Sequence, residues 1–126
     1  MSKALLVEDN ENNRYLFTLM LQDAGFTVVV APNGMAGLEM ARAEQPDVIL
    51  LDIQMPEMDG YDVAIRLKQD PALVSIPLIG VSSFAMPGDV ARAMTCGFAG
   101  YIEKPVDPDS FADIVLNLLR SAKERA

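Results

Sequence analysis

Five short apolar runs alternate with segments of helical periodicity, and this alternation most limits how the chain can fold. The runs predicted to be strands are residues 4–7, 26–31, 48–51, 78–82 and 98–102. The segments predicted to be helices are 12–24, 34–44, 60–70, 87–95 and a last one around 111–119. Strand–helix alternation with short connections favours right-handed crossovers and a parallel sheet with helices on both faces. We therefore predict an α/β fold, a doubly wound (βα)5 domain that takes up residues 1–126.

The spacing of apolar residues also predicts which side of each helix meets the sheet. In the first helix we expect Leu16, Leu19 and Met20 on the inner face, and in the second Leu38 and Ala41. The last helix has the clearest pattern, at i, i+3, i+4, i+7 and i+8: Phe111, Ile114, Val115, Leu118 and Leu119. Its final residues, 121–126, are expected to be a frayed end.

Composition excludes several kinds of site. The chain has no histidine, which removes Ser–His triads, the usual zinc sites and phosphotransfer through its own histidine. Cys96 is the single cysteine, so there is no disulfide framework, as fits a reducing cytosol. A net charge of −8 argues against a nucleic-acid partner, and no stretch approaches a membrane span or a signal peptide. We expect a soluble cytoplasmic domain without nucleic-acid or membrane partners.

Polar side chains follow four of the five predicted strands. Glu8 and Asp9 follow the first, Asp52 the third, Ser82 ends the fourth, and Lys104 follows the fifth. Because the carboxyl ends of parallel strands meet at one edge, where open α/β sheets place their ligands, these side chains should gather there. Each alone fits an ordinary turn or cap. Their joint occurrence is harder to explain in that way.

Such a group of charges favours a particular chemistry. Two carboxylates about 4 Å apart repel by roughly 4 kcal/mol at an effective dielectric constant of 20, so a proton or a cation must relieve them. Oxygen ligands without imidazole or thiolate favour Mg²⁺, which also accepts phosphate oxygens. Lys104 and Ser82 could then stabilise a transferring phosphoryl group, leaving Asp52 as the nucleophile that forms an aspartyl phosphate.

These residues stand in motifs that resemble the receiver domains of two-component response regulators, the CheY-like family. The matching stretches are 5–10 (Leu-Leu-Val-Glu-Asp-Asn), 50–56 (Leu-Leu-Asp-Ile-Gln-Met-Pro), 58–60 (Met-Asp-Gly), 81–83 (Val-Ser-Ser) and 101–105 (Tyr-Ile-Glu-Lys-Pro). The resemblance covers essentially the whole chain. It implies a flavodoxin-like fold with the sheet order 2-1-3-4-5, for which CheY is a standard example.

The resemblance also implies roles. A histidine kinase or a histidine phosphotransfer protein would pass a phosphoryl group from its phosphohistidine to Asp52. Glu8 and Asp9 match the metal-binding acidic pair, and the backbone carbonyl of Gln54 would join them and Asp52 around Mg²⁺. Lys104 matches the family's lysine.

Ser82 and Tyr101 match the switch hydroxyl and the switch aromatic, although ordinary packing would explain Tyr101 equally well. The family also implies a cis peptide bond between Lys104 and Pro105, a rare configuration at X–Pro bonds in general.

Two departures bear on how long the phosphoryl group stays bound. In this family the second residue after the nucleophile and the second after the switch hydroxyl, here Gln54 and Phe84, tune the access of water. Phe84 is bulky and carries no acid, so we expect slow hydrolysis. The face formed by the fourth helix, fifth strand and fifth helix is the expected readout surface for a downstream protein target.

Other classes of protein fit the sequence less well. The chain has no room for an output domain beside the receiver, but its first motif also fits a receiver taken from a hybrid histidine kinase. Haloacid-dehalogenase-like phosphotransferases share the Asp, Ser, Lys and Mg²⁺, but need a second aspartate where Gln54 stands. A flavodoxin-like flavin binder would share the fold, but the acidic edge would repel the flavin phosphate. A receiver that serves only as a docking module would not need all the residues used for phosphorylation, and here each of those positions is filled. We expect no turnover of a separate substrate.

Overall fold

The computed structural model describes residues 2–83 and 87–125, and the predicted alternation of strands and helices is present in them. The strands are β1 (Lys3–Val7), β2 (Thr27–Ala31), β3 (Val48–Asp52), β4 (Leu78–Ser82) and β5 (Gly100–Glu103). The helices are α1 (Glu11–Asp23), α2 (Gly34–Glu44), α3 (Gly60–Gln69), α4 (Pro87–Thr95) and α5 (Pro108–Arg125). None of the helices within these described residues is long and apolar enough to cross a bilayer.

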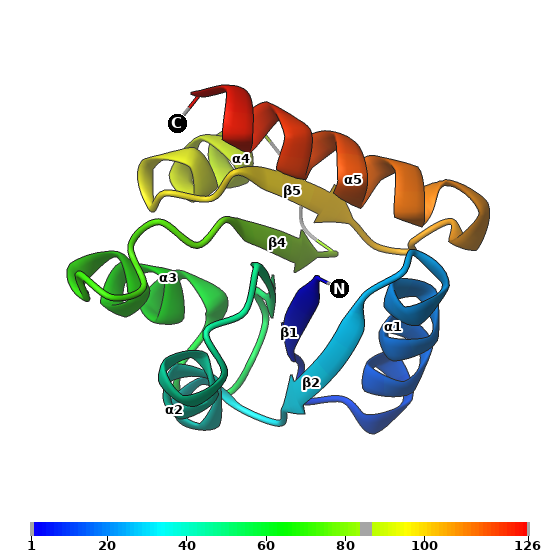
Figure 1. Ribbon diagram of the computed structural model, residues 1–126. Coiled ribbons are helices and arrows are strands. Elements are labelled where there is room, and N and C mark those ends of the chain that lie inside the picture. The colour runs from blue at the N-terminus through cyan, green and yellow to red at the C-terminus, as the bar shows by residue number, and fades with distance from the viewer. Residues whose placement is uncertain (1, 84–86, 126) are drawn as a thin grey trace.

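The strands form one parallel sheet in the order β2-β1-β3-β4-β5, which confirms the predicted fold class (Figure 1). The register aligns the strand ends on one edge: Asp52 pairs with Val81, and Ser82 pairs with Glu103. Just past these pairs, Ile53 N donates to Val81 O at 3.0 Å and Lys104 N donates to Ser82 O at 2.7 Å. The residues that follow the strands therefore start from neighbouring points.

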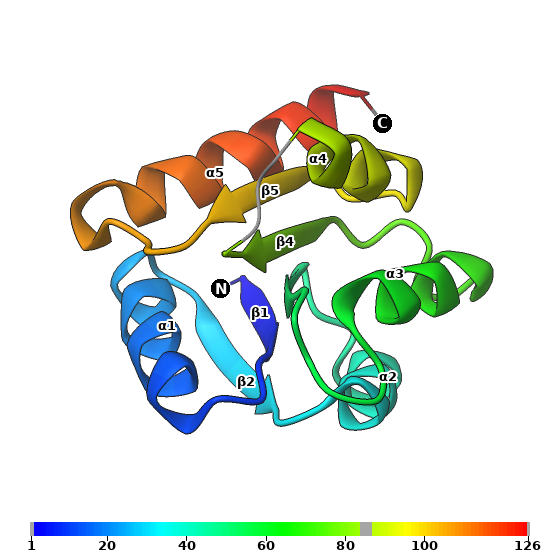
Figure 2. The same cartoon turned by 180° about the vertical axis from the view of Figure 1, so that it is seen from behind.

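Two apolar layers enclose the sheet. Helices α2, α3 and α4 lie on one face of the sheet, and α1 and α5 lie on the other (Figures 1 and 2). The buried side chains of Leu5, Ile49 and Leu51 belong to the first layer, and those of Leu6 and Leu50 to the second. Every residue of β3 is buried, as expected of a central strand covered on both faces. This explains why its sequence is an unbroken apolar run that ends in a single carboxylate.

The inner face of α1 agrees with the prediction only at Met20, which is partly buried against the core. Phe17 and Leu21 are the buried residues of this helix, whereas Leu16 and Leu19 are 55% and 43% exposed. The Phe17 ring packs on that of Phe111 in α5, with 5.8 Å between centroids. Because α1 carries apolar residues on more than one side, periodicity alone did not fix its orientation, and the bulky aromatic side chain takes the core position.

Two further elements depart slightly from expectation. β5 begins at Gly100 and not at residue 98, since Phe98 lies in the turn after α4, where its N–H donates to Ala93 O at 3.1 Å. Gly97 has a φ of 94°, which glycine adopts without steric cost. In α5, Phe111 and Val115 are fully buried, but Ile114 is 38% exposed.

Helix caps fix the loops at the carboxyl edge of the sheet. Three helices begin there at an Asn or Asp whose side chain accepts a hydrogen bond from the backbone three residues on. The pairs are Asn10 with Asn13 N, Asn33 with Ala36 N, and Asp59 with Asp62 N. The chain thus leaves each of these loops in a defined direction.

Candidate functional site

Asp52 ends the central strand β3, and its carboxylate lies in the edge that the other strand ends surround. The residue is 4% exposed. Its Oδ1 atom accepts a hydrogen bond from Gln54 N at 3.2 Å and lies 3.3 Å from Lys104 Nζ. A buried carboxylate held by a backbone N–H and an ammonium group keeps a fixed orientation.

The acidic pair after β1 faces Asp52 across the sheet edge. Glu8, Asp9 and Asp52 each offer one carboxylate oxygen, and these oxygens lie within 4.8 Å of one another. Glu8 is 1% exposed, whereas Asp9 is open to solvent. The structure thus brings together the three carboxylates that the sequence placed at this edge.

Backbone contacts and one arginine hold the acidic turn. Glu8 N donates to Ala31 O at 3.1 Å, and the Oε2 atom of Glu8 accepts from Asn10 N at 3.2 Å. Arg14 Nη1 donates to the backbone carbonyls of Glu8 and Asp9 at 3.0 and 3.1 Å. The role of Arg14 was not predicted, because its contacts are to backbone atoms and leave no pattern of paired side chains in the sequence.

Lys104 reaches the carboxylates from the end of β5. Its Nζ atom lies 3.4 Å from Glu8 Oε1 and 3.3 Å from Asp52 Oδ1, so one ammonium group faces both acids. The peptide bond between Lys104 and Pro105 is cis, the configuration that the resemblance implied.

The charges at this edge are not balanced by Lys104 alone. Burial raises the pKa of Glu8 to about 8, and its hydrogen bond with Asp52 and the repulsion between the two carboxylates add to that effect. The Asn10 N–H and Lys104 act in the opposite direction. Three carboxylates carry more negative charge than one lysine neutralises, and oxygen ligands suit a hard divalent cation such as Mg²⁺, which could replace the proton on Glu8. The residues therefore fit this metal.

Ser82 is held by a residue from the neighbouring loop. Gln54 Nε2 donates to Ser82 Oγ, while Gln54 Oε1 accepts from Ser83 N at 3.2 Å. Ser82 is fully buried at the end of β4. The sequence pointed to Gln54 for its backbone carbonyl and for water access, and the contact of its side chain with Ser82 was not foreseen.

Tyr101 lies in β5, where its side chain is hydrogen-bonded to that of Tyr61 at the start of α3. The Tyr61 hydroxyl also donates to Asp89 O in α4 at 3.2 Å, and its ring meets Phe98 edge-on at 6.2 Å between centroids. Burial, followed by the Tyr101 contact, raises the pKa of Tyr61 to about 12. Tyr61 was missed, because a tyrosine one residue into a helix looks like ordinary core packing.

Phe84, expected to tune the lifetime of a phosphoryl group, lies outside the described residues.

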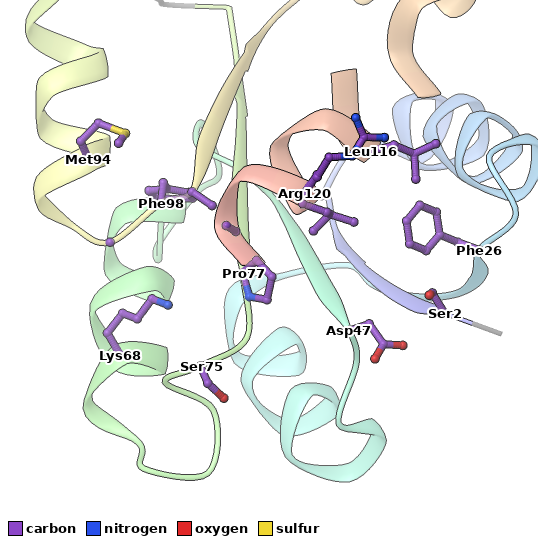
Figure 3. Close-up of a pocket in the computed structure, with 14 residues that line it drawn as sticks. Ser2, Phe26, Asp47, Lys68, Ser75, Pro77, Met94, Phe98, Leu116 and Arg120 are labelled. Atoms are coloured by element: carbon purple, nitrogen blue, oxygen red, sulfur yellow. The ribbon is translucent and has the colours of Figure 1, made fainter. Parts of the chain in front are cut away.

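A cavity of about 860 Å³ is lined by residues that precede strands, among them Ser2, Asp47 and Pro77, and by residues of α3, α4 and α5 (Figure 3). It lies at the edge of the sheet opposite Asp52 and has no part in this site.

Comparison with known proteins now identifies the family. The family model of the response regulator receiver domain matches residues 4–116. The polar-differentiation response regulator DivK of Brucella anthropi is 40% identical over 118 residues, which cover 94% of this chain and 96% of that protein. DivK of Brucella ovis is 39% identical with the same coverage. The chain belongs to the response regulator receiver domain family, which acts in two-component signalling.

Solved structures agree with this assignment. The chemotaxis protein CheY4 of Vibrio cholerae superposes with a TM-score of 0.89 at 26% identity, covering 94% of this chain and 98% of that one. The receiver domain of a signal transduction histidine kinase from Syntrophus aciditrophicus gives 0.85 at 32% identity, covering 96% and 92%. The receiver domain of the sensor histidine kinase PA1611 from Pseudomonas aeruginosa, solved with magnesium coordinated in its active site cleft, gives 0.85 at 26%, covering 94% and 98%.

Proposed function

We propose that this chain is a phosphoacceptor, which takes a phosphoryl group from the phosphohistidine of a histidine kinase or a histidine phosphotransfer protein. An oxygen of the Asp52 carboxylate attacks phosphorus and forms an acyl phosphate. The bond between phosphorus and the partner's imidazole nitrogen breaks, and the imidazole leaves. The observation that carries the proposal is the buried Asp52 carboxylate, with an ammonium group 3.3 Å away and two further carboxylates beside it.

The acidic residues supply the place for the metal. Glu8, Asp9 and Asp52 would hold Mg²⁺ together with the backbone carbonyl of Gln54. The ion would neutralise the carboxylates and the incoming phosphoryl oxygens. A related receiver domain, that of PA1611, was solved with magnesium in its active site cleft, which supports this part of the proposal.

The remaining residues of the site would act on the phosphoryl group once it is bound. Lys104 faces Asp52 Oδ1 and would pair with a phosphoryl oxygen, and Ser82 would donate a hydrogen bond to another. These contacts favour one arrangement of the loops after β4 and β5 over another and so shift the population of α4 and its neighbours. We assign the readout to the α4–β5–α5 face, where Tyr101 would move with Ser82 and a downstream protein would bind.

The wider organisation belongs to the same proposal. Residues 1–126 form one cytoplasmic receiver domain, acting alone or as part of a hybrid histidine kinase. Its relatives include both the DivK response regulators and a histidine kinase receiver domain. The phosphoryl group is lost slowly by hydrolysis, tuned by Gln54 and Phe84, without turnover of a separate substrate. A faster loss in Phe84→Glu would support that tuning.

The first test is intact mass after incubation with acetyl phosphate and Mg²⁺. The wild-type protein should gain one phosphoryl group, and the gain should require the metal. Asp52→Asn should gain none, whereas Asp113→Asn, a matched change at an exposed position of α5, should behave as the wild type. Labelling of Asp52→Asn to the same extent would contradict the assignment of the nucleophile.

Phosphotransfer itself is tested with a phosphorylated histidine protein as donor. Loss of label from the donor should match its gain by the wild-type chain and should be absent with Asp52→Asn. Continuous release of phosphate from phosphate esters, independent of Asp52, would point to an enzyme of another kind.

A further inference from the structure

The Gln54 side chain joins the segment after β3 to the end of β4. Ile53 N donates to Val81 O at 3.0 Å, so the segment after β3 begins beside the end of β4. From this segment, the Gln54 amide makes two contacts there, with the Ser82 hydroxyl and the Ser83 backbone N–H. The Gln54 backbone meanwhile donates to Asp52 Oδ1 at 3.2 Å. A single residue therefore touches both the nucleophile and the hydroxyl.

The two contacts fix which way the amide faces. A backbone N–H can only donate, so the Gln54 atom that lies 3.2 Å from Ser83 N must be the carbonyl oxygen Oε1. The amide nitrogen Nε2 then faces Ser82 Oγ, and because an amide NH₂ only donates, the Ser82 oxygen is the acceptor in this bond. The orientation follows from the hydrogen-bonding capacity of the groups.

The bond from Gln54 uses one lone pair of the Ser82 hydroxyl. A serine hydroxyl has one proton and two lone pairs. When one lone pair accepts from Gln54, the proton points away from the amide toward another acceptor. Ser82 is fully buried and lies on the strand next to Asp52, where a phosphoryl oxygen would be such an acceptor.

We infer that Gln54 is a positioning residue, whose side-chain amide holds the Ser82 hydroxyl as a hydrogen-bond donor toward a phosphoryl group on Asp52. The inference rests on the proposed phosphoacceptor function and adds a role for the Gln54 side chain within it. It differs from the control of water access expected at this position, because it acts on the affinity for the bound group before any hydrolysis.

The test is the affinity for beryllofluoride, a phosphoryl mimic that binds the aspartate without chemistry, measured by calorimetry with Mg²⁺ present. Gln54→Met keeps the length of the side chain and removes both hydrogen bonds, and should weaken binding roughly three- to tenfold. Gln54→Glu should weaken it further, because a carboxylate accepts the Ser82 proton and repels the mimic. Gln69→Met, at an exposed position late in α3, should bind as the wild type.

A double-mutant cycle separates positioning from a general change in the loop. In a Ser82→Ala background, Gln54→Met should cause no further loss of affinity. An equal loss in that background, or tighter binding by Gln54→Met, would overturn the inference while leaving the wild-type response intact. If the wild-type protein does not bind beryllofluoride through Asp52, the proposed function is wrong and the positioning role falls with it.

Discussion

The guanidinium carbon of Arg92 in α4 lies 4.0 Å from the centroid of the Tyr61 ring in α3. The Tyr61 hydroxyl donates to Asp89 O and is hydrogen-bonded to the Tyr101 side chain, so one buried tyrosine contacts both α4 and β5. α3 begins directly after the loop that follows Asp52. Tyr61 thus links the helix that follows the Asp52 loop to the face proposed for readout.

The hydroxyl of Tyr61 should contribute measurably to stability. Tyr61→Phe keeps the ring and removes the hydroxyl, and should lower the free energy of unfolding by about 1–2 kcal/mol, since two partner groups lose their hydrogen bond. Arg92→Ala should cost about 0.5–1 kcal/mol, because the cation lies at the surface. Urea unfolding measures both. Tyr15→Phe is the matched control, since Tyr15 is 66% exposed and its hydroxyl should contribute little. Equal effects at Tyr15 and Tyr61 would contradict the structural role of Tyr61.

The pKa of Glu8 predicts a dependence of stability on pH. Its value rises from an ordinary 4.5 to about 8 on folding, so between these two values the folded chain holds a proton that the unfolded chain has lost. Without metal, the contribution of Glu8 to the free energy of unfolding should therefore be fully present below about pH 4.5 and be lost as the pH rises to about 8. Denaturation midpoints over this range measure the loss.

Two comparisons tie that slope to Glu8. Glu8→Gln should remove most of it, whereas Glu11→Gln, at an exposed position in the first turn of α1, should leave it unchanged. Mg²⁺ should restore stability mainly at the upper end of the range, because it binds the deprotonated carboxylate. A slope that persists in Glu8→Gln would show that other groups cause it.

Lys104 should affect metal binding and phosphorylation in opposite directions. Its ammonium group lies 3.3–3.4 Å from two of the carboxylates that would hold Mg²⁺, so it competes with the ion for the same charges. Lys104→Met should therefore tighten Mg²⁺ binding by roughly three- to tenfold, the scale of one screened charge near the ion. The same change should slow labelling by acetyl phosphate about a hundredfold, because a phosphoryl oxygen loses its cation.

The control for Lys104 is Lys3→Met, which removes a charge paired with Glu44 at 2.9 Å, close to the start of β1. It should change neither quantity. Weaker Mg²⁺ binding in Lys104→Met would show that the lysine supports the metal site and does not oppose it.

The positions of Glu8, Asp52 and Ser82 could be predicted because each ends a strand or follows one directly. An apolar run that is buried on both faces, such as residues 48–51, fixes where the strand ends, and parallel pairing then brings Glu8, Asp52 and Ser82 to one edge. Neither step requires the orientation of a side chain. The sheet order was implied by the family resemblance.

What the sequence left open depends on orientation. Leu16 and Leu19 were wrongly predicted to face inward in α1, because apolar residues lie on several sides of that helix, and Phe17 takes the core position by packing against Phe111. The contact of Gln54 with Ser82 depends on a side-chain rotamer in a loop. The contact of Tyr61 with Tyr101 depends on how α3 is rotated over the sheet. Neither contact is indicated by a periodic pattern or a fixed spacing of residues in the sequence.

Gly60 should be the glycine that the site tolerates least in substitution. A Cβ atom at this position would lie 2.8 Å from the Asp52 carbonyl oxygen and 2.9 Å from Ile53 Cα, both backbone atoms at the proposed nucleophile or next to it. Gly60→Ala should therefore lower the free energy of unfolding by about 1–3 kcal/mol, the usual cost of overpacking. It should also slow labelling of Asp52, because relief of the clash must move β3 or the loop after it. Gly88→Ala in α4 is the control, since a Cβ there meets nothing within 4 Å and alanine should stabilise the helix by up to about 1 kcal/mol. Normal labelling of a destabilised Gly60→Ala protein would show that the helix α3 yields to the added methyl group and that Asp52 keeps its place.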